Sequence, residues 1–197
     1  MKKIKMIMAL MCVMLFTLSA CGSSAGTNAT VTEAPVETPE ADEPQDGVLS
    51  VFEAVGLDGK NYDQTVLEGH KITMINVWGT FCGPCIKEMP YLGDFSREYD
   101  SSDFQIIGII CDAADREMKP IESALADARD IISDTKADYL HLLPSESLTE
   151  RVLYYADAVP LTFFVNEKGE QVGDGYVGSR DKKSWKKIIN ELLESVK

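Results

Sequence analysis

Hydrophobic and polar positions between residues 47 and 197 follow two periods, one typical of strands and one typical of helices. Short, nearly uncharged apolar runs predict buried strands, and apolar residues three and four positions apart predict amphipathic helices. The predicted strands cover residues 51–55, 72–78, 104–111, 139–143, 161–165 and 171–177. The predicted helices cover residues 82–99, 121–134, 146–155 and 181–196.

The order of these elements predicts the fold class. Strands alternate with helices, and the chain then ends in a hairpin followed by a helix. This order is typical of an α/β protein with a central mixed sheet flanked by helices. The region is long enough for one well-buried core, and no internal repeat divides it. We therefore expect one globular domain at residues 47–197.

The first twenty residues have the pattern of a signal peptide rather than of a folded segment. Three lysines precede an apolar run at residues 7–18, which is too short to span a bilayer comfortably. The run ends in Leu-Ser-Ala-Cys at residues 18–21, which resembles the lipobox of bacterial lipoproteins. That resemblance implies cleavage after residue 20 and lipidation of the Cys21 thiol. An ordinary secretory signal with an incidental cysteine is the alternative.

Residues 21–46 are predicted to be a lipidated cysteine followed by a disordered acidic linker. Residues 22–46 contain six acidic residues, no basic residue, and only Val31 and Val36 as large apolar residues. A segment of this composition cannot bury enough apolar surface to fold. With residues 1–20 as the signal peptide, the predicted location is the extracytoplasmic face of a bacterial cell membrane, held by the lipid anchor. The net charge of −13 disfavours nucleic acid as a partner.

Two cysteines, two residues apart, follow a strand-like apolar run and open the next predicted helix. Residues 78–90 are WGTFCGPCIKEMP, with Cys82 and Cys85 as the pair. A helix N-terminus stabilises a thiolate, which is the reactive form of cysteine. We expect Cys82 to be partly exposed there and Cys85 to lie beneath it, within reach of a disulfide. Pro84 suits the first helical turn, whereas Pro90 is expected to kink or end the helix.

The cysteine pair predicts dithiol redox chemistry rather than a metal site. A structural zinc site needs two further ligands, and His70, His141 and Cys111 are isolated in the sequence. A c-type haem would need histidine where Ile86 stands. We therefore expect no metal and no cofactor other than a redox-active disulfide. Cys111 is interpreted as a small buried apolar residue, with a third redox thiol as the alternative.

Three features carry a resemblance to a known family. They are the motif at 78–90, a Val-Pro-Leu-Thr segment at 159–162 before a strand, and the terminal hairpin with its helix. With these features the chain resembles thioredoxin-fold proteins, and more narrowly the TlpA/ResA-like group of membrane-tethered extracytoplasmic thiol–disulfide oxidoreductases. A hairpin segment at 56–60, an extra helical stretch after Cys111, and Glu-Met-Pro at 88–90 favour this group. The resemblance implies a thioredoxin-like fold with a helical insertion before a cis-proline loop.

The resemblance also implies roles for particular residues. Cys82 matches the nucleophile that forms a mixed disulfide with the substrate, and Cys85 matches the thiol that resolves it. Pro160 matches the cis-proline that faces the active site, and Val159 would offer backbone hydrogen bonds to an extended substrate. Glu88 matches an acidic residue near the cysteines, where a carboxylate exchanges protons with Cys85. A solvated helix glutamate is the alternative for Glu88.

Other positions refine this resemblance. Trp78 is expected to take part in substrate binding together with the cis-proline loop. Asn76 stands where cytoplasmic thioredoxins place a buried aspartate. Because an amide cannot ionise, Asn76 cannot accept a proton, and this favours Glu88 as the proton acceptor. Phe81 replaces a tryptophan often found before the first cysteine, and it keeps an aromatic side chain without the N–H donor.

The implied function is that of a membrane-tethered thiol–disulfide oxidoreductase, expected to be a monomer and a disulfide reductase. The Gly-Pro dipeptide between the cysteines resembles that of reducing thioredoxins. A reductant in an oxidising compartment must be recharged, so we expect a membrane electron donor of the CcdA/DsbD type. The second expected partner is a protein client with a disulfide or an oxidised thiol, in cytochrome c maturation or oxidised-protein repair.

Four alternatives remain open at the level of sequence. A thiol oxidase or isomerase would use the same residues with the opposite redox poise. A thiol peroxidase would need threonine where Gly79 stands. A copper-binding metallochaperone would need a histidine partner, for which His141 is the candidate, and usually a wider cysteine spacing. A binding module with a degenerate site is disfavoured by the intact cysteine pair.

Overall fold

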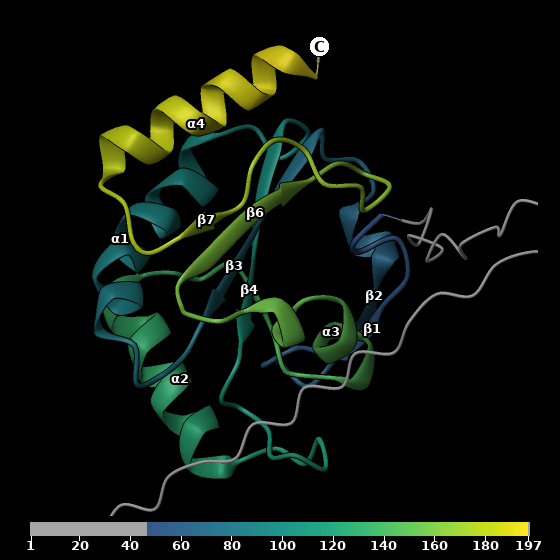
Figure 1. Ribbon diagram of the computed structural model, residues 1–197. Coiled ribbons are helices and arrows are strands. Elements are labelled where there is room, and N and C mark those ends of the chain that lie inside the picture. The colour runs from purple at the N-terminus through teal and green to yellow at the C-terminus, as the bar shows by residue number, and fades with distance from the viewer. Residues whose placement is uncertain (1–46, 197) are drawn as a thin grey trace, which may run out of the picture. The chain divides into compact units, whose positions relative to one another are not determined.

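The computed structural model describes residues 47–196, and its central element is a five-stranded sheet (Figure 1). In spatial order the strands are β5 (Leu140–Leu142), β4 (Phe104–Ile110), β3 (Ile72–Trp78), β6 (Leu161–Val165) and β7 (Tyr176–Val177). β3 pairs in parallel with β4, and β4 with β5, whereas β6 runs antiparallel to both β3 and β7. The sheet is therefore mixed, as predicted.

Helices and a small hairpin cover the two faces of the sheet (Figure 1). One face carries three helices, α1 (Gly83–Glu98), α2 (Glu122–Thr135) and α4 (Lys182–Ser195). The other face carries α3 (Glu146–Arg151), the 3-10 helices η1 (Gln64–Leu67) and η2 (Leu153–Tyr155), and a hairpin of β1 (Glu53–Val55) and β2 (Asn61–Asp63). The predicted α/β class, with a central mixed sheet flanked by helices, is confirmed.

The alternation of side chains along β3 divides the core between the two faces. Every residue of β3 is buried, as is typical of a central strand covered on both sides. Met74 and Trp78 pack with α1, whereas Ile75 and Val77 pack with the elements on the opposite face. Because the side-chain period of a strand is two, the polar residue Asn76 also faces α1.

α1 carries the cysteine pair at its N-terminal end and continues through Pro90 to Glu98. The sequence predicted that Pro90 would either kink or end the helix, and the helix does not end there. Proline removes a single helical hydrogen bond, here the one to the carbonyl of Ile86. Met89 and Leu92 are fully buried on either side of it. The apolar face of α1 thus keeps both halves of the helix packed against the sheet.

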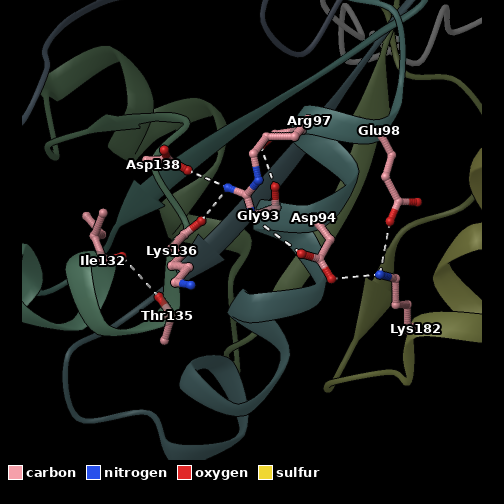
Figure 2. Close-up of polar contacts among 10 residues, drawn as sticks. Gly93, Asp94, Arg97, Glu98, Ile132, Thr135, Lys136, Asp138 and Lys182 are labelled. Carbon is pink, nitrogen blue, oxygen red and sulfur yellow. Dashed lines mark hydrogen bonds and ion pairs between the residues drawn. The ribbon is translucent and has the colours of Figure 1, made fainter.

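The exposed side of α1 is tied to the segment after α2 and to the start of α4 (Figure 2). Arg97 Nη1 donates to Asp138 Oδ1 at 2.6 Å and to the carbonyl oxygen of Lys136 at 2.8 Å. Lys182 Nζ donates to Asp94 Oδ2 at 2.6 Å. Exposed ion pairs contribute little to stability, so we expect these contacts to add only a little to the packing that holds α1 against the sheet.

Two predicted elements are interrupted by a residue whose backbone conformation does not fit them. Of the strand predicted at 171–177, only β7 and a single bridge at Gln171 are present. Gly173 lies between them with a φ of 70°, and this left-handed conformation does not fit a strand. The helix predicted at 146–155 is divided at Val152, whose φ of −129° is not helical. The hairpin segment predicted at 56–60 joins β1 to β2, whereas η1 had no counterpart among the predicted elements.

The predicted signal peptide at 1–20 and the lipidated cysteine and acidic linker at 21–46 lie outside the described residues. These segments, the lipidation of Cys21, and the domain boundary at residue 47 therefore stay predictions. Within residues 47–196, no helix combines the length and the apolar character that crossing a membrane requires.

Candidate active site

The cysteine pair forms a disulfide at the N-terminal end of α1. The sulfur atoms of Cys82 and Cys85 are bonded, and their Cα atoms lie 5.3 Å apart. Cys85 is 1% exposed and lies in the core, as expected. Cys82 is only 5% exposed, so the expectation of a partly exposed first cysteine is wrong for this disulfide form. The preceding residue, Phe81, is 70% exposed and reaches into solvent beside the pair.

Cys82 is the N-cap residue of α1, and its sulfur receives a backbone N–H. The N–H of Cys85 points at Cys82 Sγ over 3.2 Å. Pro84 occupies the first turn, where no N–H is needed. The partial positive charge of a helix N-terminus favours an anion at this position. After reduction, this donor and the helix dipole would favour a thiolate on Cys82.

The loop before β6 lies against Cys82. The Val159–Pro160 peptide bond is cis, the geometry that the resemblance implied. The carbonyl oxygen of Val159 lies 3.6 Å from Cys82 Sγ. A disulfide sulfur carries no proton, so this is a contact and not a hydrogen bond. Pro160 is buried, and its carbonyl accepts the N–H of Gly178 at 2.8 Å. The structure thus brings the cis-proline loop and the first cysteine together.

Glu88 is buried on the inner side of α1, one turn after the second cysteine. It is 1% exposed, which excludes the alternative of a solvated glutamate. Glu88 Oε2 accepts the backbone N–H of Arg180 at 2.9 Å and the indole N–H of Trp185 at 3.0 Å. Oε1 accepts a longer bond, of 3.4 Å, from Asn76 Nδ2. Burial raises the pKa of Glu88, although these hydrogen bonds and the charge of Arg180 act in the opposite direction.

Asn76 connects this carboxyl group to β6. Its Nδ2 also donates to Thr162 Oγ1 at 3.0 Å, and these two residues are paired across β3 and β6. Among the described residues, the buried Asn76 Oδ1 has no hydrogen-bond partner. Rotation of the amide by half a turn would direct this acceptor towards Glu88. The cluster can therefore accommodate Glu88 with or without a proton.

Trp78 lies beneath the cysteine pair and not at the surface. Its side chain is fully buried, so in this state it does not contact a client, contrary to the expectation that it takes part in substrate binding. The indole N–H donates to His141 Nδ1 at 3.1 Å, and His141 Nε2 donates to the carbonyl of Ala137 at 2.8 Å. These partners require the neutral tautomer with its proton on Nε2. Burial lowers the pKa of His141 to about 4.

The same hydrogen bonds bear on the possibility of metal binding. Both ring nitrogens of His141 are engaged inside the protein, so this arrangement leaves neither of them to bind a metal. The copper metallochaperone alternative thereby loses the histidine that it requires. Across residues 47–196, no three His, Cys, Asp or Glu side chains are grouped so that they could hold a metal ion.

Asp112 holds the loop that precedes Cys82. Its Oδ1 and Oδ2 each accept the N–H of Thr80 at 3.1 Å, and Oδ2 also accepts the Thr80 hydroxyl at 2.6 Å. The neighbouring Cys111 packs with the cluster on the α3 face of the sheet, whereas the cysteine pair belongs to a cluster on the α1 face. Burial raises the pKa of Cys111 to about 11. A packing role for Cys111 therefore fits better than a redox role.

Several residues of this site had no polar role in the sequence-based predictions, namely Thr80, Asp112, Thr162, Arg180 and Trp185. Thr162 lies 86 positions from Asn76, and Trp185 lies 97 positions from Glu88. Contacts over such separations leave no local pattern in a single sequence. Trp185 was predicted only as part of the apolar face of the last helix.

Residues 31–189 match the sequence model of the Redoxin family. The chain belongs to the Redoxin family. The match includes the cysteine pair, Glu88 and the cis-proline loop, and it begins within the predicted linker.

Similar proteins with curated names are thiol–disulfide oxidoreductases. Over an alignment of 74 residues, this Redoxin-family chain is 35% identical to thiol-disulfide oxidoreductase ResA of Bacillus thuringiensis (strain Al Hakam). The alignment covers 33% of this chain and 43% of that protein. Sporulation thiol-disulfide oxidoreductase A of Bacillus subtilis is 24% identical over 131 residues, which is 66% of this chain and 73% of that protein. The alignment with ResA thus spans less than half of that relative's length.

Solved structures show the same fold. A thiol:disulfide interchange protein of Chlorobium tepidum superposes with a TM-score of 0.59 at 22% identity, covering 73% of this chain and 93% of that one. The exposed lipoprotein thioredoxin Etrx1 of Streptococcus pneumoniae gives a TM-score of 0.55 at 22% identity, covering 72% and 98%. Likeness at these identities shows the fold alone, and it confirms the predicted thioredoxin-like architecture.

The predicted resemblance to the TlpA/ResA-like group is confirmed by the ResA relatives. Together with the bonded cysteine pair, these relatives confirm an oxidoreductase of the thiol–disulfide type at the level of the matched domain. The roles of the individual site residues stay predictions.

Proposed function

We propose that this Redoxin-family protein is a membrane-tethered thiol–disulfide oxidoreductase that reduces a disulfide on a protein client through Cys82 and Cys85. The proposal rests on one observation, the meeting of the disulfide, the N-terminus of α1 and the cis Val159–Pro160 loop at a single point. Cys82 Sγ lies 3.2 Å from a backbone N–H and 3.6 Å from the carbonyl of Val159. A nucleophilic sulfur and a backbone edge for an extended client are therefore adjacent.

The reaction begins with the reduced pair. The Cys82 thiolate attacks one sulfur of the client disulfide and bonds to it, and the other client sulfur leaves as a thiolate and takes up a proton. The deprotonated Cys85 then attacks Cys82 Sγ, which restores the Cys82–Cys85 disulfide and releases the second client sulfur. The client gains two electrons and two protons, and the protein loses them.

Glu88 is the proposed acceptor of the proton that Cys85 gives up. Residues three positions apart on a helix are neighbours, and both side chains are buried. The raised pKa of Glu88 brings its titration closer to neutral pH, where a group that takes up and releases protons works best. Trp78 supports the pair from beneath, and the exposed Phe81 offers an apolar contact at the rim.

The tether and the direction of electron flow are proposed from the sequence. The Leu-Ser-Ala-Cys segment ending at Cys21 and the acidic linker at 22–46 would hold the domain at the extracytoplasmic face of a bacterial cell membrane. The similar protein from Streptococcus pneumoniae is named an exposed lipoprotein thioredoxin, which supports this placement. The Gly-Pro dipeptide between the cysteines favours a reductant. The proposed electron donor is a membrane protein of the CcdA/DsbD type, and the proposed client belongs to cytochrome c maturation or oxidised-protein repair.

Trapping of the client tests this proposal. Cys85→Ser removes the resolving thiol and keeps the nucleophile, so a mixed disulfide between Cys82 and the client should accumulate. It would be detected on non-reducing gels and identified by mass spectrometry, with the full chain expressed in a bacterial host.

The matched control is Cys82→Ser, which should capture no client because the nucleophile is gone. Capture by Cys82→Ser instead of Cys85→Ser would reverse the assigned roles. Capture by neither variant would contradict a client disulfide as the substrate.

A further inference from the structure

The C-terminal helix reaches the buried carboxyl group beside the cysteine pair. Trp185, in the first turn of α4, donates its indole N–H to Glu88 Oε2 at 3.0 Å. Arg180, in the loop before α4, donates its backbone N–H to the same oxygen at 2.9 Å. The last part of the chain therefore contacts α1 at the residue that is proposed to exchange protons with the second cysteine.

The two oxygens of this carboxyl group are held differently. Glu88 Oε2 has two N–H donors within 3.0 Å, whereas the donor to Oε1, Asn76 Nδ2, lies at 3.4 Å. Hydrogen bonds to a carboxylate favour the charged form, and burial opposes it. The C-terminal segment thus supplies the two short bonds that support the charged form, and Oε1 is the oxygen left to take up a proton.

The position of the indole ring is itself fixed by its neighbours. Trp185 is fully buried, and its ring lies edge-on to Tyr176 at 5.6 Å and to Phe164 at 6.4 Å between centroids. The guanidinium carbon of Arg180 lies 5.3 Å from the Trp185 ring and 4.6 Å from the Tyr176 ring. This packing fixes the direction of the indole N–H.

We propose that Trp185 is a positioning residue for the dithiol site. Its indole N–H anchors Glu88 Oε2, keeps Oε1 directed to Asn76, and thereby makes the proton exchange between Cys85 and Glu88 depend on helix α4. The inference rests on the proposed function and deepens it, because it adds the C-terminal helix to the site.

Charged and titratable groups near Glu88 affect the titration of its carboxyl group. Arg180 brings a positive charge from the loop before α4, and Tyr139 interacts with Glu88 from the segment between α2 and β5. Burial raises the pKa of Tyr139 far above neutral, so this residue stays uncharged. Asn76 on β3 does not titrate. In the oxidised protein Cys85 is part of the disulfide and does not titrate, so Glu88 is the group of this cluster whose titration is followed.

The first test is the titration of the Glu88 carboxyl group in the oxidised full chain, followed by its carbon-13 NMR shift. Trp185→Phe keeps an aromatic ring and removes the indole N–H. The Glu88 midpoint should rise by about one pH unit, the size expected for the loss of one hydrogen bond to a charged group. The matched control is Ile189→Val, which trims a fully buried apolar side chain of the same helix and should leave the midpoint in place.

The second test is the pH dependence of Cys82 alkylation in the reduced full chain. Trp185→Phe should shift this profile in the wild-type background and should have no effect in a Glu88→Gln background. An unchanged midpoint in Trp185→Phe, an equal change in Ile189→Val, or a profile shift that persists with Glu88→Gln would overturn the proposal. The carboxyl titration needs neither a client nor activity, so its outcome is independent of a failure of the proposed function.

Discussion

At the scale of single residues, two buried groups with opposite pKa shifts lie near the cysteine pair. Burial raises the pKa of Glu88 above its ordinary 4.5 and lowers the pKa of His141 from 6.5 to about 4. The stability that Glu88 contributes is present at pH values below its ordinary pKa, and it is lost as the pH rises through the raised pKa of the folded protein. The contribution of His141 has the opposite dependence. It is present above pH 6.5 and is lost as pH falls towards 4.

His141→Gln should therefore flatten the acid side of the stability profile. Between pH 6.5 and pH 4 the imidazole of His141 binds a proton in the unfolded chain but stays neutral in the folded protein. This difference lowers the free energy of unfolding of the wild type by about 3 kcal/mol. The free energy of unfolding, measured by urea denaturation at each pH, should fall by about this amount more in the wild type than in His141→Gln.

The control for this prediction is His70→Gln, which changes the other histidine of the chain. Its profile should keep the slope of the wild type. Equal slopes in the wild type and His141→Gln would mean that His141 is not held neutral by the fold.

The chemistry of single residues was predictable where it depends on neighbours in the sequence. Cys82 and Cys85 form one local motif at a strand-to-helix junction, and the sequence placed their disulfide correctly. The setting of Glu88 was not predictable, since its donors Arg180 and Trp185 lie 92 and 97 positions away. Trp78 was predicted to belong to a buried strand, and the side-chain alternation of β3 directs it into the core.

At the scale of elements, α1 approaches the end of α2 closely through Gly93 (Figure 2). A Cβ at this position would collide with the carbonyl oxygen of Lys136, the residue that caps α2. Arg97 holds the same carbonyl at 2.8 Å, so the oxygen is not free to move aside. Glycine is therefore required by packing, although it is a poor helix former.

Gly93→Ala should destabilise the protein despite the better helix propensity of alanine. Overpacking of this kind costs about 1–3 kcal/mol, which exceeds the gain of about 1 kcal/mol from propensity. The free energy of unfolding in urea is the measurement. Gly175→Ala is the control, because a Cβ there meets nothing within 4 Å. A more stable Gly93→Ala variant would contradict the described contact between α1 and the end of α2.

Elements were predictable where one period dominates the pattern. β3 and β6 have the predicted bounds, because both are short apolar runs in the middle of the sheet. The strand predicted at 171–177 failed at Gly173, where the backbone turns left-handed. α1 continued past Pro90 because tertiary packing outweighs one missing hydrogen bond.

At the scale of the whole molecule, a thioredoxin-like domain of the Redoxin family is proposed to work from a lipid tether. The order of strands and helices was sufficient to predict the class of the sheet, since few topologies satisfy such an order. Recognition of the client and of the electron donor depends on the surfaces of those proteins as well as on this one. The sequence of one chain carries no pattern that specifies them. The reduction potential, by contrast, is a property of the cysteine pair itself.

The reduction potential of the Cys82/Cys85 couple tests the central claim most directly. The full chain would be equilibrated in glutathione or dithiothreitol buffers, and the fraction of the disulfide would be followed by thiol labelling. A reductant requires a value near or below about −220 mV, close to the thioredoxin-like value of about −270 mV. A value above about −150 mV, approaching the −120 mV or so of a strong oxidase, would contradict the proposed reductase and make the protein a disulfide donor.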